Sequence, residues 1–332
     1  MATLATNIVT LADLKAGMDP NGAPATAIEI LNETNEILED MSWLEGNLPT
    51  GHQHSVRTGL PTPAWRLLNY GVPQSKGSQV QVTDTCGMLE SYSEVDKKLL
   101  GLNGYNAGWR LQQDRPFVEA FGQTLADTIF YGNTAATPER FLGLAPRFAS
   151  SSAGTGQNIV KADGSASGAT QTSVWLIGWS NTTIHGIYPK GSMAGLQIED
   201  LGEDTKVDSG GLMYQVMRTH FEWDCGLAVP DWRYVVRICN IDIDNLTKTG
   251  STGSDLIDAM TQALEIIESL SGVRPCFYAN RKVRSFLRRQ IANKVVNSTL
   301  TMDTVAGKRV MTFDEVPVKR CDAILNTEAV VS

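Results

Sequence analysis

Few side chains in this sequence have the types and spacing of a chemical site. His52 and His54 form an H-x-H pair, but no third nitrogen, thiol or carboxylate ligand follows nearby in the sequence. Zinc sites take at least three protein ligands, so a polar loop is the simpler interpretation and metal binding the alternative. His185 and His220 fall in expected strands, where hydrogen-bonded structural histidines are common. We therefore predict no metal ligands.

One acidic motif resembles the start of a calcium-binding loop, Asn240-x-Asp242-x-Asp244. However, Asn245 stands where the turn requires glycine, and Ser251 stands where the bidentate glutamate should be. A capped strand end is the simpler interpretation of this motif.

Three pairs of neighbouring carboxylates have the chemistry of glycoside hydrolysis, Glu199/Asp200, Glu203/Asp204 and Asp242/Asp244. Acidic turns explain these pairs more simply. The glycine-rich segments 101–108 and 154–156 match neither the dinucleotide-binding fingerprint nor the phosphate-binding loop, and no G-x-S-x-G motif is present. The sequence therefore predicts no catalytic residues, no enzyme activity and no cofactor.

The most concentrated positive charge lies on the outer face of an expected helix over residues 281–294. Its members are Arg281, Lys282, Arg284, Arg288 and Arg289. Such a face suits acidic subunit surfaces or packaged nucleic acid, bound without base specificity. A solvated helix face is the alternative.

The secondary structure that positions these side chains is organised around residues 111–148. Phe117, Phe121, Leu125 and Ile129 recur at every fourth position, which is typical of a core helix. We expect Asp114 to cap it, Pro116 to lie in its first turn and Gly132 to end it. The apolar run 141–144 then predicts a strand after a polar loop.

The segment 51–88 is rich in Gly, Pro, Ser and Thr, and it predicts an extended hairpin that we call the flap. A two-stranded hairpin is marginal in water, so the flap needs a partner surface. Its candidate contact residues are Trp65, Tyr70, Val80 and Val82. Before it we expect an arm and an acidic helix over 24–44, and after it a helix capped by Ser93 and reaching Leu100.

The rest of the chain alternates between strands and helices. Residues 149–172 predict a surface excursion. Expected strands occupy 174–179, 183–188, 212–223, 232–243, 275–279, 309–313, 316–318 and 323–325. Expected helices run from Ser254 or Asp255 to Leu270 and from Arg281 to Lys294. The pattern indicates an α+β fold.

Composition restricts the class of protein. The 332 residues are 42% hydrophobic and 19% charged, which is typical of a folded chain long enough for two domains. A net charge of −8 argues against a dedicated nucleic-acid reader. The low charged share and the seven Trp residues indicate extensive protein contacts, with an ordinary aromatic core as the alternative.

Targeting and redox signals are weak. The first residues lack a basic region followed by an apolar core, and no apolar run approaches the ~20 residues of a membrane span. Five scattered cysteines suit reduced thiols better than a disulfide framework. We expect a soluble protein that is made in a cytoplasm and has no membrane partner.

Three segments in order resemble tailed-phage major capsid proteins. DRPFVEAFGQTLADTIFYGNTAATPERFLGL resembles their long helix, loop and strand, RPCFYANRKVRSFLRRQI the strand and helix of their axial domain, and VPVKRCDAILNTEAVV their closing strands. The whole chain is most similar to the short-tailed phage branch of epsilon fifteen and the Bordetella phages. Each motif is short and degenerate, but their order spans about 300 residues.

The resemblance implies a Hong Kong 97-like capsid fold. Its parts would be an N-terminal arm (1–50), the extended loop or flap with a linker (51–110), a peripheral domain with spine helix and β-sheet (111–245), and an axial domain with closing strands (246–332). It also implies a virion protein that self-assembles, as hexamers and pentamers, into the icosahedral head around double-stranded DNA.

The implied partners are other copies of the chain, a cement or decoration protein, a scaffold and a portal, with assembly in the host cytoplasm. Contact with packaged DNA would be non-specific. Two alternatives stay open at this point. One is a tail, decoration or other oligomeric virion module, and the other is a β-rich hydrolase with carboxylates on loops.

Overall fold

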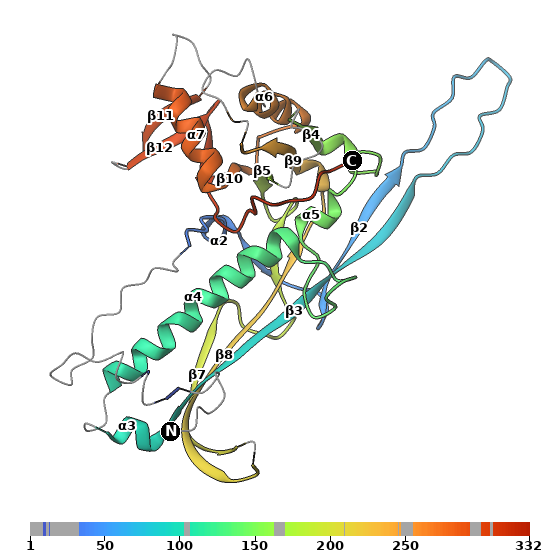
Figure 1. Cartoon of the computed structure of the whole chain (residues 1–332). Helices are drawn as coiled ribbons and strands as arrows, with labels where there is room; N and C mark the ends of the chain where they lie inside the picture. Colours follow the sequence, from blue (N-terminus) through green and yellow to red (C-terminus); the bar gives the residue numbers. More distant parts are fainter. Residues whose placement is uncertain are drawn as a thin grey trace. The chain divides into compact units, whose positions relative to one another are not determined.

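A computed structural model describes residues 9–10, 13, 33–102, 107–162, 170–208, 210–244, 246, 255–292, 300–305 and 308–332. The chain forms two compact units, and Figure 1 labels their helices and strands. The first unit contains Met1–Glu33, Met88–Leu125 and Met193–Asp224, and the second contains Thr34–Gly87, Ala126–Ser192 and Cys225–Ser332. Three elements contribute residues to both units, β3 (Ser78–Asp96), α4 (Ala107–Tyr131) and β8 (Met213–Ala228).

A seven-stranded sheet organises the second unit, with the strand order β11-β12-β13-β10-β5-β9-β4. Its strands are β4 (Ile159–Lys161), β5 (Gln171–Trp179), β9 (Val235–Asp242), β10 (Arg274–Ala279), β11 (Leu300–Val305), β12 (Lys308–Phe313) and β13 (Val316–Arg320). The pairs β10–β13 and β4–β9 are parallel, and the others are antiparallel. Every residue of β5 and β9 is buried, as the nearly continuous apolar runs predict for interior strands.

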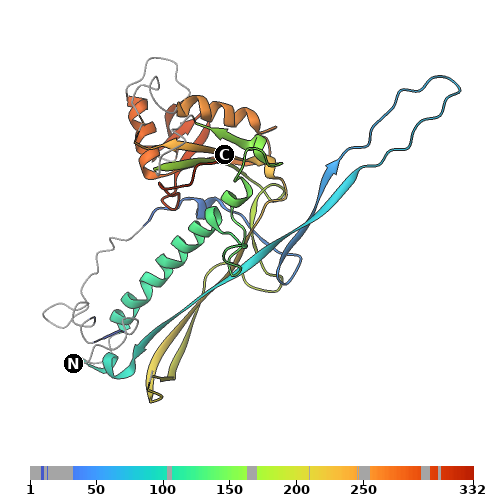
Figure 2. The ribbon, with the colours of Figure 1, turned by 45° about the vertical axis from the view of Figure 1, so that its right-hand side comes forward.

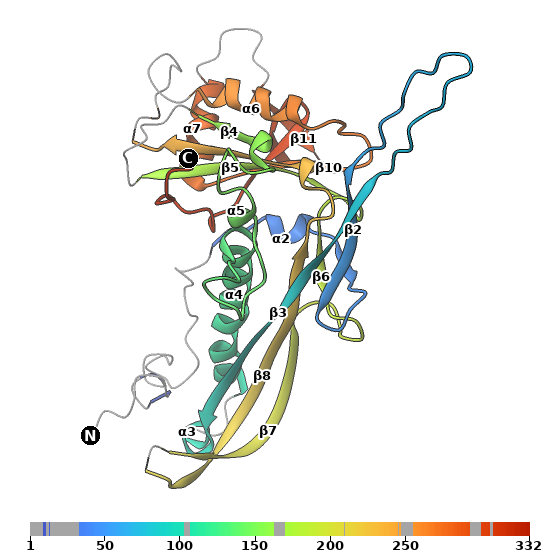
Figure 3. The ribbon, with the colours of Figure 1, turned by 90° about the vertical axis from the view of Figure 1, so that its right-hand side faces the viewer.

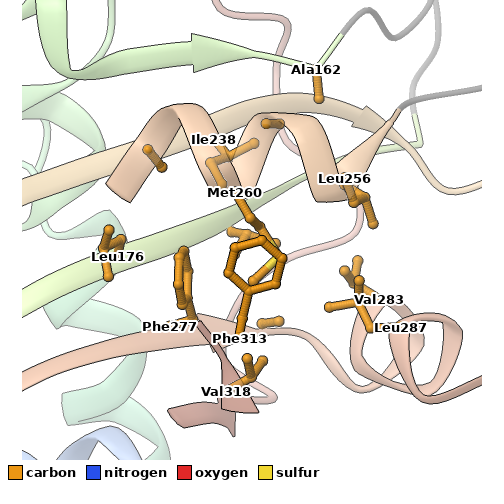
Figure 4. Packing of buried hydrophobic residues seen from close by; sticks show 14 of the residues in the cluster. Ala162, Leu176, Ile238, Leu256, Met260, Phe277, Val283, Leu287, Phe313 and Val318 are labelled. Atoms are coloured by element: carbon orange, nitrogen blue, oxygen red, sulfur yellow. The ribbon is translucent and has the colours of Figure 1, made fainter. Parts of the chain in front are cut away.

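Two helices, α6 (Leu256–Ile266) and α7 (Arg281–Ala292), cover one face of this sheet. Figure 4 shows Met260 from α6 meeting Phe277 and Phe313 from the sheet, with Val283 and Leu287 from α7 beside them. The Asp255 side chain caps α6 by accepting hydrogen bonds from the amides of residues 257 and 258, both at 3.2 Å. The prediction of a start at Ser254 or Asp255 is confirmed, but α6 ends at Ile266, before the expected Leu270.

The opposite face of the sheet packs against the end of α4, the short helix α5 (Leu144–Arg147) and the C-terminal residues. The Trp175 ring of β5 lies 5.9 Å from the ring of Phe130 and 6.1 Å from that of Phe148, measured between centroids. Because side chains alternate along β5, its neighbours Val174 and Leu176 point to the helix-covered face. The centre of the sheet is therefore buried on both sides.

A second sheet has the order β1-β6-β8-β3-β2, with β7 (Gln197–Val207) also paired to β8. The strands β1 (Trp43–Glu45), β2 (Gly51–Gly59) and β6 (His185–Tyr188) belong to the second unit. The flap is the β2–β3 hairpin, paired from Gly51 opposite Thr85 to Gly59 opposite Ser78. Figure 2 shows its tip, residues 60–77, clear of the seven-stranded sheet. The predicted hairpin is confirmed.

In the first unit, the early turns of α4 run along β3, β7 and β8 (Figure 3). The Phe117 and Phe221 rings stack at 5.3 Å, and Phe121 lies 6.2 Å from Phe221. A second cluster joins Trp109 to buried residues of β3 and of α3 (Lys97–Gly101). The apolar spacing therefore identifies the buried face of α4 correctly.

The predicted start of α4 is wrong. Asp114 is not its cap and Pro116 is not in its first turn, because the helix begins at Ala107. Trp109, which is 1% exposed, and the buried Arg110 anchor the additional turns. Asp114 instead lies 3.6 Å from Arg110 on the helix surface. Tertiary packing therefore overrides the preference of proline for a helix N-terminus.

The predicted strand at 141–144 is also wrong, since this run leads into α5. The amide of Gly143 donates to the carbonyl of Gly132 over 2.8 Å, which folds the loop tightly against the end of α4. A Cβ on Gly132 would lie 2.3 Å from the Phe141 oxygen, so only glycine fits there. The predicted helix end at Gly132 is confirmed.

Several shorter predictions fail for local reasons. Ser93 is buried inside β3, and Asp96 caps α3 instead, accepting from Lys98 N at 2.7 Å. Residues 159–161 form β4 because they pair with β9 inside the expected surface excursion. Residues 323–325 form a turn, not a strand.

The expected helix over 24–44 lies largely outside the described residues, since 24–32 are among those left undescribed. In its described part, a helix covers only α2 (Ile37–Asp40), and β1 follows at Trp43 because it pairs with β6.

Candidate subunit-interaction surfaces

The flap tip carries the most exposed apolar side chains of the described chain. All residues from 60 to 81 are exposed, and the Trp65 side chain is fully accessible to solvent. Leu68 is 86% exposed and Tyr70 is 70% exposed. Exposed apolar patches of this kind mark interaction sites. The structure therefore places the predicted contact residues Trp65 and Tyr70 at the tip.

The other two predicted contact residues, Val80 and Val82, lie on β3 where it pairs with β2. Val80 is opposite Val56 and is 51% exposed, whereas Val82 is half-buried opposite His54. Because they are two residues apart on β3, their side chains lie on the same face of the hairpin. The four predicted residues thus belong to one hairpin but to two places on it.

The flap is also cationic. Between residues 51 and 83 it contains Arg57, Arg66 and Lys76 and no Asp or Glu, although the chain as a whole has a net charge of −8. A positively charged, apolar flap suits a partner surface that carries carboxylates.

The five predicted basic residues do share the outer side of α7, but they differ in their partners. Arg281 binds Asp322 over 2.8 Å, and the Arg284 guanidinium lies 4.0 Å from the Glu36 carboxylate. Lys282, Arg288 and Arg289 are exposed, and no carboxylate of the described residues lies within ion-pair distance of them. These three are the available part of the patch.

An open hollow of about 350 Å³ lies beside this patch. Ile243, Leu246 and Phe286 form its apolar side, and Arg289 stacks over the Phe286 ring with its central carbon 5.5 Å from the centroid. The hollow combines apolar surface with positive charge.

The motif that resembles a calcium-binding loop, Asn240-x-Asp242-x-Asp244, lies at the end of β9 and caps it. Asn240, with φ of 59°, donates from its side chain to the Val331 carbonyl at 3.0 Å and accepts from the Val331 amide at 2.9 Å. The Asp242 carboxylate accepts from the amide of Asp244 at 3.0 Å. These groups hold the end of β9 and the C-terminal residues together.

The acidic pairs Glu199/Asp200 and Glu203/Asp204 do not lie in turns, which corrects that expectation. They lie on β7, where Glu203 pairs with Lys97 over 2.5 Å and Asp204 pairs with Arg218. A strand with so many exposed charges is hard to recognise from alternation alone. Burial tends to raise the pKa of nearby Glu94, but hydrogen bonds from Lys206 and Arg218 outweigh it and keep that pKa below its usual range.

One cluster is not predictable from the sequence, because His185 is about 130 residues away from the H-x-H pair. In the structure, β6 places His185 against β2, with its ring 5.8 Å from that of His52. Across the described ranges, no group of three or more His, Cys, Asp or Glu side chains is arranged to hold a metal ion. None of the helices in these ranges is both long enough and apolar enough to cross a membrane.

Solved structures define the class of this fold. A chain of bacteriophage Epsilon15 matches with a TM-score of 0.81 and 35% identity over all of both chains. The bacteriophage JBD30 capsid matches with a TM-score of 0.52 and 10% identity, over 95% of this chain and 99% of that one, which concerns the fold alone. The protein therefore has the Hong Kong 97-like phage capsid fold that the sequence predicts.

The chain belongs to the family described as major capsid protein GP7, which matches residues 19–332. No curated protein matches the sequence significantly. The protein is accordingly a structural subunit of a bacteriophage capsid shell, located in the virion and associating with other copies of itself. The resemblance to tailed-phage major capsid proteins of the epsilon fifteen branch is confirmed, and the capsid function is favoured over the tail-module and hydrolase alternatives.

Proposed function

We propose that this protein forms hexamers and pentamers that close an icosahedral head around double-stranded DNA. In this proposal it assembles around a scaffold and a portal in the host cytoplasm, is reinforced by a cement or decoration protein, and has no catalytic role or cofactor. The domain division into an arm (1–50), flap and linker (51–110), peripheral domain (111–245) and axial domain (246–332) stays a prediction.

The exposure of the flap tip is the observation that supports this proposal. Burying a large apolar side chain on a neighbouring subunit contributes roughly 1.5–3 kcal/mol. Trp65, Leu68 and Tyr70 together therefore offer several kcal/mol per contact, part of which offsets the ordering of the tip. In a closed shell each subunit repeats the contact, so modest contacts produce a stable assembly.

A flap-shortened variant tests this role. Residues 60–77 are replaced by Asn-Gly, which closes the hairpin between Gly59 and Ser78 with a two-residue turn and preserves the β2–β3 register. We expect folded protein that forms no closed heads when it is expressed with its scaffold, observed by electron microscopy and sedimentation. Normal heads from this variant would show that the tip is not needed.

Point variants distinguish the loss of a specific flap contact from the loss of any exposed apolar side chain. Trp65→Ser is expected to reduce head yield at least tenfold. The matched control is Met193→Ser, because Met193 is also exposed, at 69%, but lies outside the flap. Equal yields from both variants would contradict the assigned role of Trp65.

The basic face of α7 supports a second proposal, non-specific contact with packaged DNA. Lys282, Arg288 and Arg289 are exposed and lie on one helix, so their cationic groups are accessible to DNA phosphates. Each phosphate that a cationic side chain neutralises adds about 0.9 to the log–log slope of DNA affinity against salt concentration.

We therefore expect the triple Glu variant of these residues to bind duplex DNA more weakly and with a slope reduced by two or three. The control changes the exposed Arg115, Lys161 and Lys190 to Glu, which alters net charge equally. If both triple variants lose affinity equally, overall charge and not the α7 face governs binding.

A further inference from the structure

Three of the four histidines in the chain lie together at the root of the flap. His52 and His54 are on β2, where their rings stack at 6.3 Å with an interplanar angle of 22°. His185 on β6 approaches His52 edge-on at 5.8 Å. We call these residues the root histidines. All three belong to the second unit, so their contacts lie within one compact body.

The root histidines are enclosed and poorly supplied with partners. His185 is 1% exposed, and the His54 side chain is 10% exposed. The Nδ1 atom of His52 and both ring nitrogens of His54 are buried without a hydrogen-bond partner among the described residues. Uncharged imidazoles tolerate such an environment better than imidazolium ions do.

Two other charged groups face the cluster. Asp84 on β3 lies 3.8 Å from His54 Nδ1, but its carboxylate already binds Arg147 of α5 over 2.7 Å and the Val229 amide over 3.1 Å. Arg147 adds a positive charge of its own. The site therefore contains three imidazoles, one guanidinium and a single carboxylate, which is already bound to other groups.

Three backbone hydrogen bonds lie beside the root histidines. Gly46 N donates to the Tyr188 carbonyl at 2.8 Å, Gly186 N to the Ser42 carbonyl at 2.8 Å and Lys190 N to the Leu48 carbonyl at 3.2 Å. These bonds attach the segment that leads into β2 to β6 and the residues after it. The root histidines lie at the same junction.

We propose that the root histidines form a proton-sensitive lock, which holds β2 and its leading segment on β6 while the rings are neutral and releases the flap root when they are protonated. Two neighbouring imidazolium ions about 6 Å apart repel each other, and burial strengthens that repulsion. The proposal concerns the folded chain itself and goes beyond shell formation, so it stands or fails independently of that function.

The protonation energetics agree with this geometry. Burial, reinforced by His52 and His54, lowers the pKa of His185 to about 4, against the opposing effects of the Ser180 backbone and Asp84. Burial also lowers the pKa of His54, with Asp84 acting in the opposite direction. Neutral rings are thus favoured in the closed state, and closure weakens as pH falls below the ordinary value of 6.5. For His185 alone, the opening equilibrium is expected to rise about 30-fold between pH 7.5 and pH 5.

Hydrogen exchange of the full chain tests the lock. Exchange is measured by mass spectrometry at pH 7.5, 6 and 5, corrected for intrinsic rates, with light scattering to record assembly state. We expect the protection of the Gly46, Gly186 and Lys190 amides to fall about 30-fold at pH 5. The amides of β5 and β9 serve as an internal reference and should stay protected.

Variants complete the test. His185→Gln is expected to reduce the fall in protection to a few-fold, and His54→Gln to reduce it partly. His220→Gln, which changes the one histidine outside the cluster, should behave as wild type. If the amides of β5 and β9 are no longer protected in His185→Gln at pH 7.5, that substitution disturbs the whole fold. The test then uses His54→Gln, because His54 is more accessible. Unchanged protection in wild type, or an undiminished fall in both cluster variants, would overturn the proposal.

Discussion

The guanidinium of Arg237 and the carboxylate of Glu328 meet over 2.8 Å with both side chains about 5% exposed. Arg237 also donates to the Ser173 hydroxyl at 3.1 Å and to the Phe148 carbonyl at 2.8 Å. This pair joins β9 to the C-terminal residues beneath the seven-stranded sheet. Because both side chains are buried, neither can exchange its partner for bulk water.

Removing one member of this pair leaves a buried charge uncompensated. We expect Glu328→Gln to lower the free energy of unfolding by about 3–5 kcal/mol. Urea denaturation followed by tryptophan fluorescence measures the change. The exposed pair Arg233–Glu268, at 2.6 Å, supplies the control, and Glu268→Gln should cost less than about 1 kcal/mol. Equal costs would mean that burial does not distinguish the two pairs.

Asp40, at the end of α2, is attached to the seven-stranded sheet. Its carboxylate accepts from the Tyr278 hydroxyl at 2.6 Å and pairs with Lys319. We expect Asp40→Asn to destabilise the protein by about 1–3 kcal/mol, since two buried or half-buried partners lose a charged acceptor. Thermal unfolding reports the loss. The exposed neighbour Glu39 gives the control Glu39→Gln, for which a similar loss would argue against a specific anchor.

The stability of the fold should depend on the ionisation of Asp322 at acidic pH. Burial would raise the pKa of this carboxyl, but hydrogen bonds from Arg320, Arg281 and the Thr34 amide outweigh it and hold that pKa far below its ordinary 3.8. The ionised group therefore stabilises the fold above pH 3.8, and this contribution is lost as pH falls below that value.

Asp322→Asn should accordingly be less stable than wild type at pH 5, and the difference should shrink by pH 3. Urea midpoints at the two pH values measure it. The exposed Glu265 offers the control Glu265→Gln, whose difference from wild type should stay small throughout. A gap for Asp322→Asn that is constant with pH would refute the assignment.

The turn after α4 gives a steric prediction. Gly132→Ala places a Cβ 2.3 Å from the Phe141 oxygen and 2.6 Å from the Thr128 oxygen, both of which are backbone atoms. We expect a loss of more than about 2 kcal/mol, because backbone must move to relieve the overlap. Gly154→Ala is the control, since a Cβ there has no neighbour within 4 Å. Stability is compared by thermal unfolding, and a neutral Gly132→Ala would show that the loop yields freely.

The sequence predicts elements whose burial pattern is regular and misses those fixed by distant partners. Phe121, Leu125 and Ile129 identify the buried face of α4, and the apolar run of β9 identifies an interior strand. Pro116 misleads because Trp109 and Arg110 are held by tertiary packing. The strand β7 is missed because its acidic residues are exposed and paired with cations that are distant in sequence.

The candidate interaction surfaces divide in the same way. The exposure of Trp65 and Tyr70 is predictable, because an apolar residue in a Gly- and Pro-rich hairpin has nowhere to be buried. The pairing of Arg281 with Asp322 and the approach of Arg284 to Glu36 are not predictable, because they depend on how the chain ends meet α7. The root histidines are missed for a similar reason, since about 130 residues separate His54 from His185 and only the tertiary contact between β2 and β6 brings them together.

The position of β5 between β9 and β10 has a consequence during protein synthesis. The strand β10 begins at Arg274, about 95 residues after β5 ends at Trp179. Ribosomes add about 5–20 residues per second, so one hydrogen-bonding edge of β5 waits roughly 5–20 seconds for its neighbour. A nascent chain at this stage exposes an apolar strand edge, which is a site where it can aggregate with other chains before β10 is made.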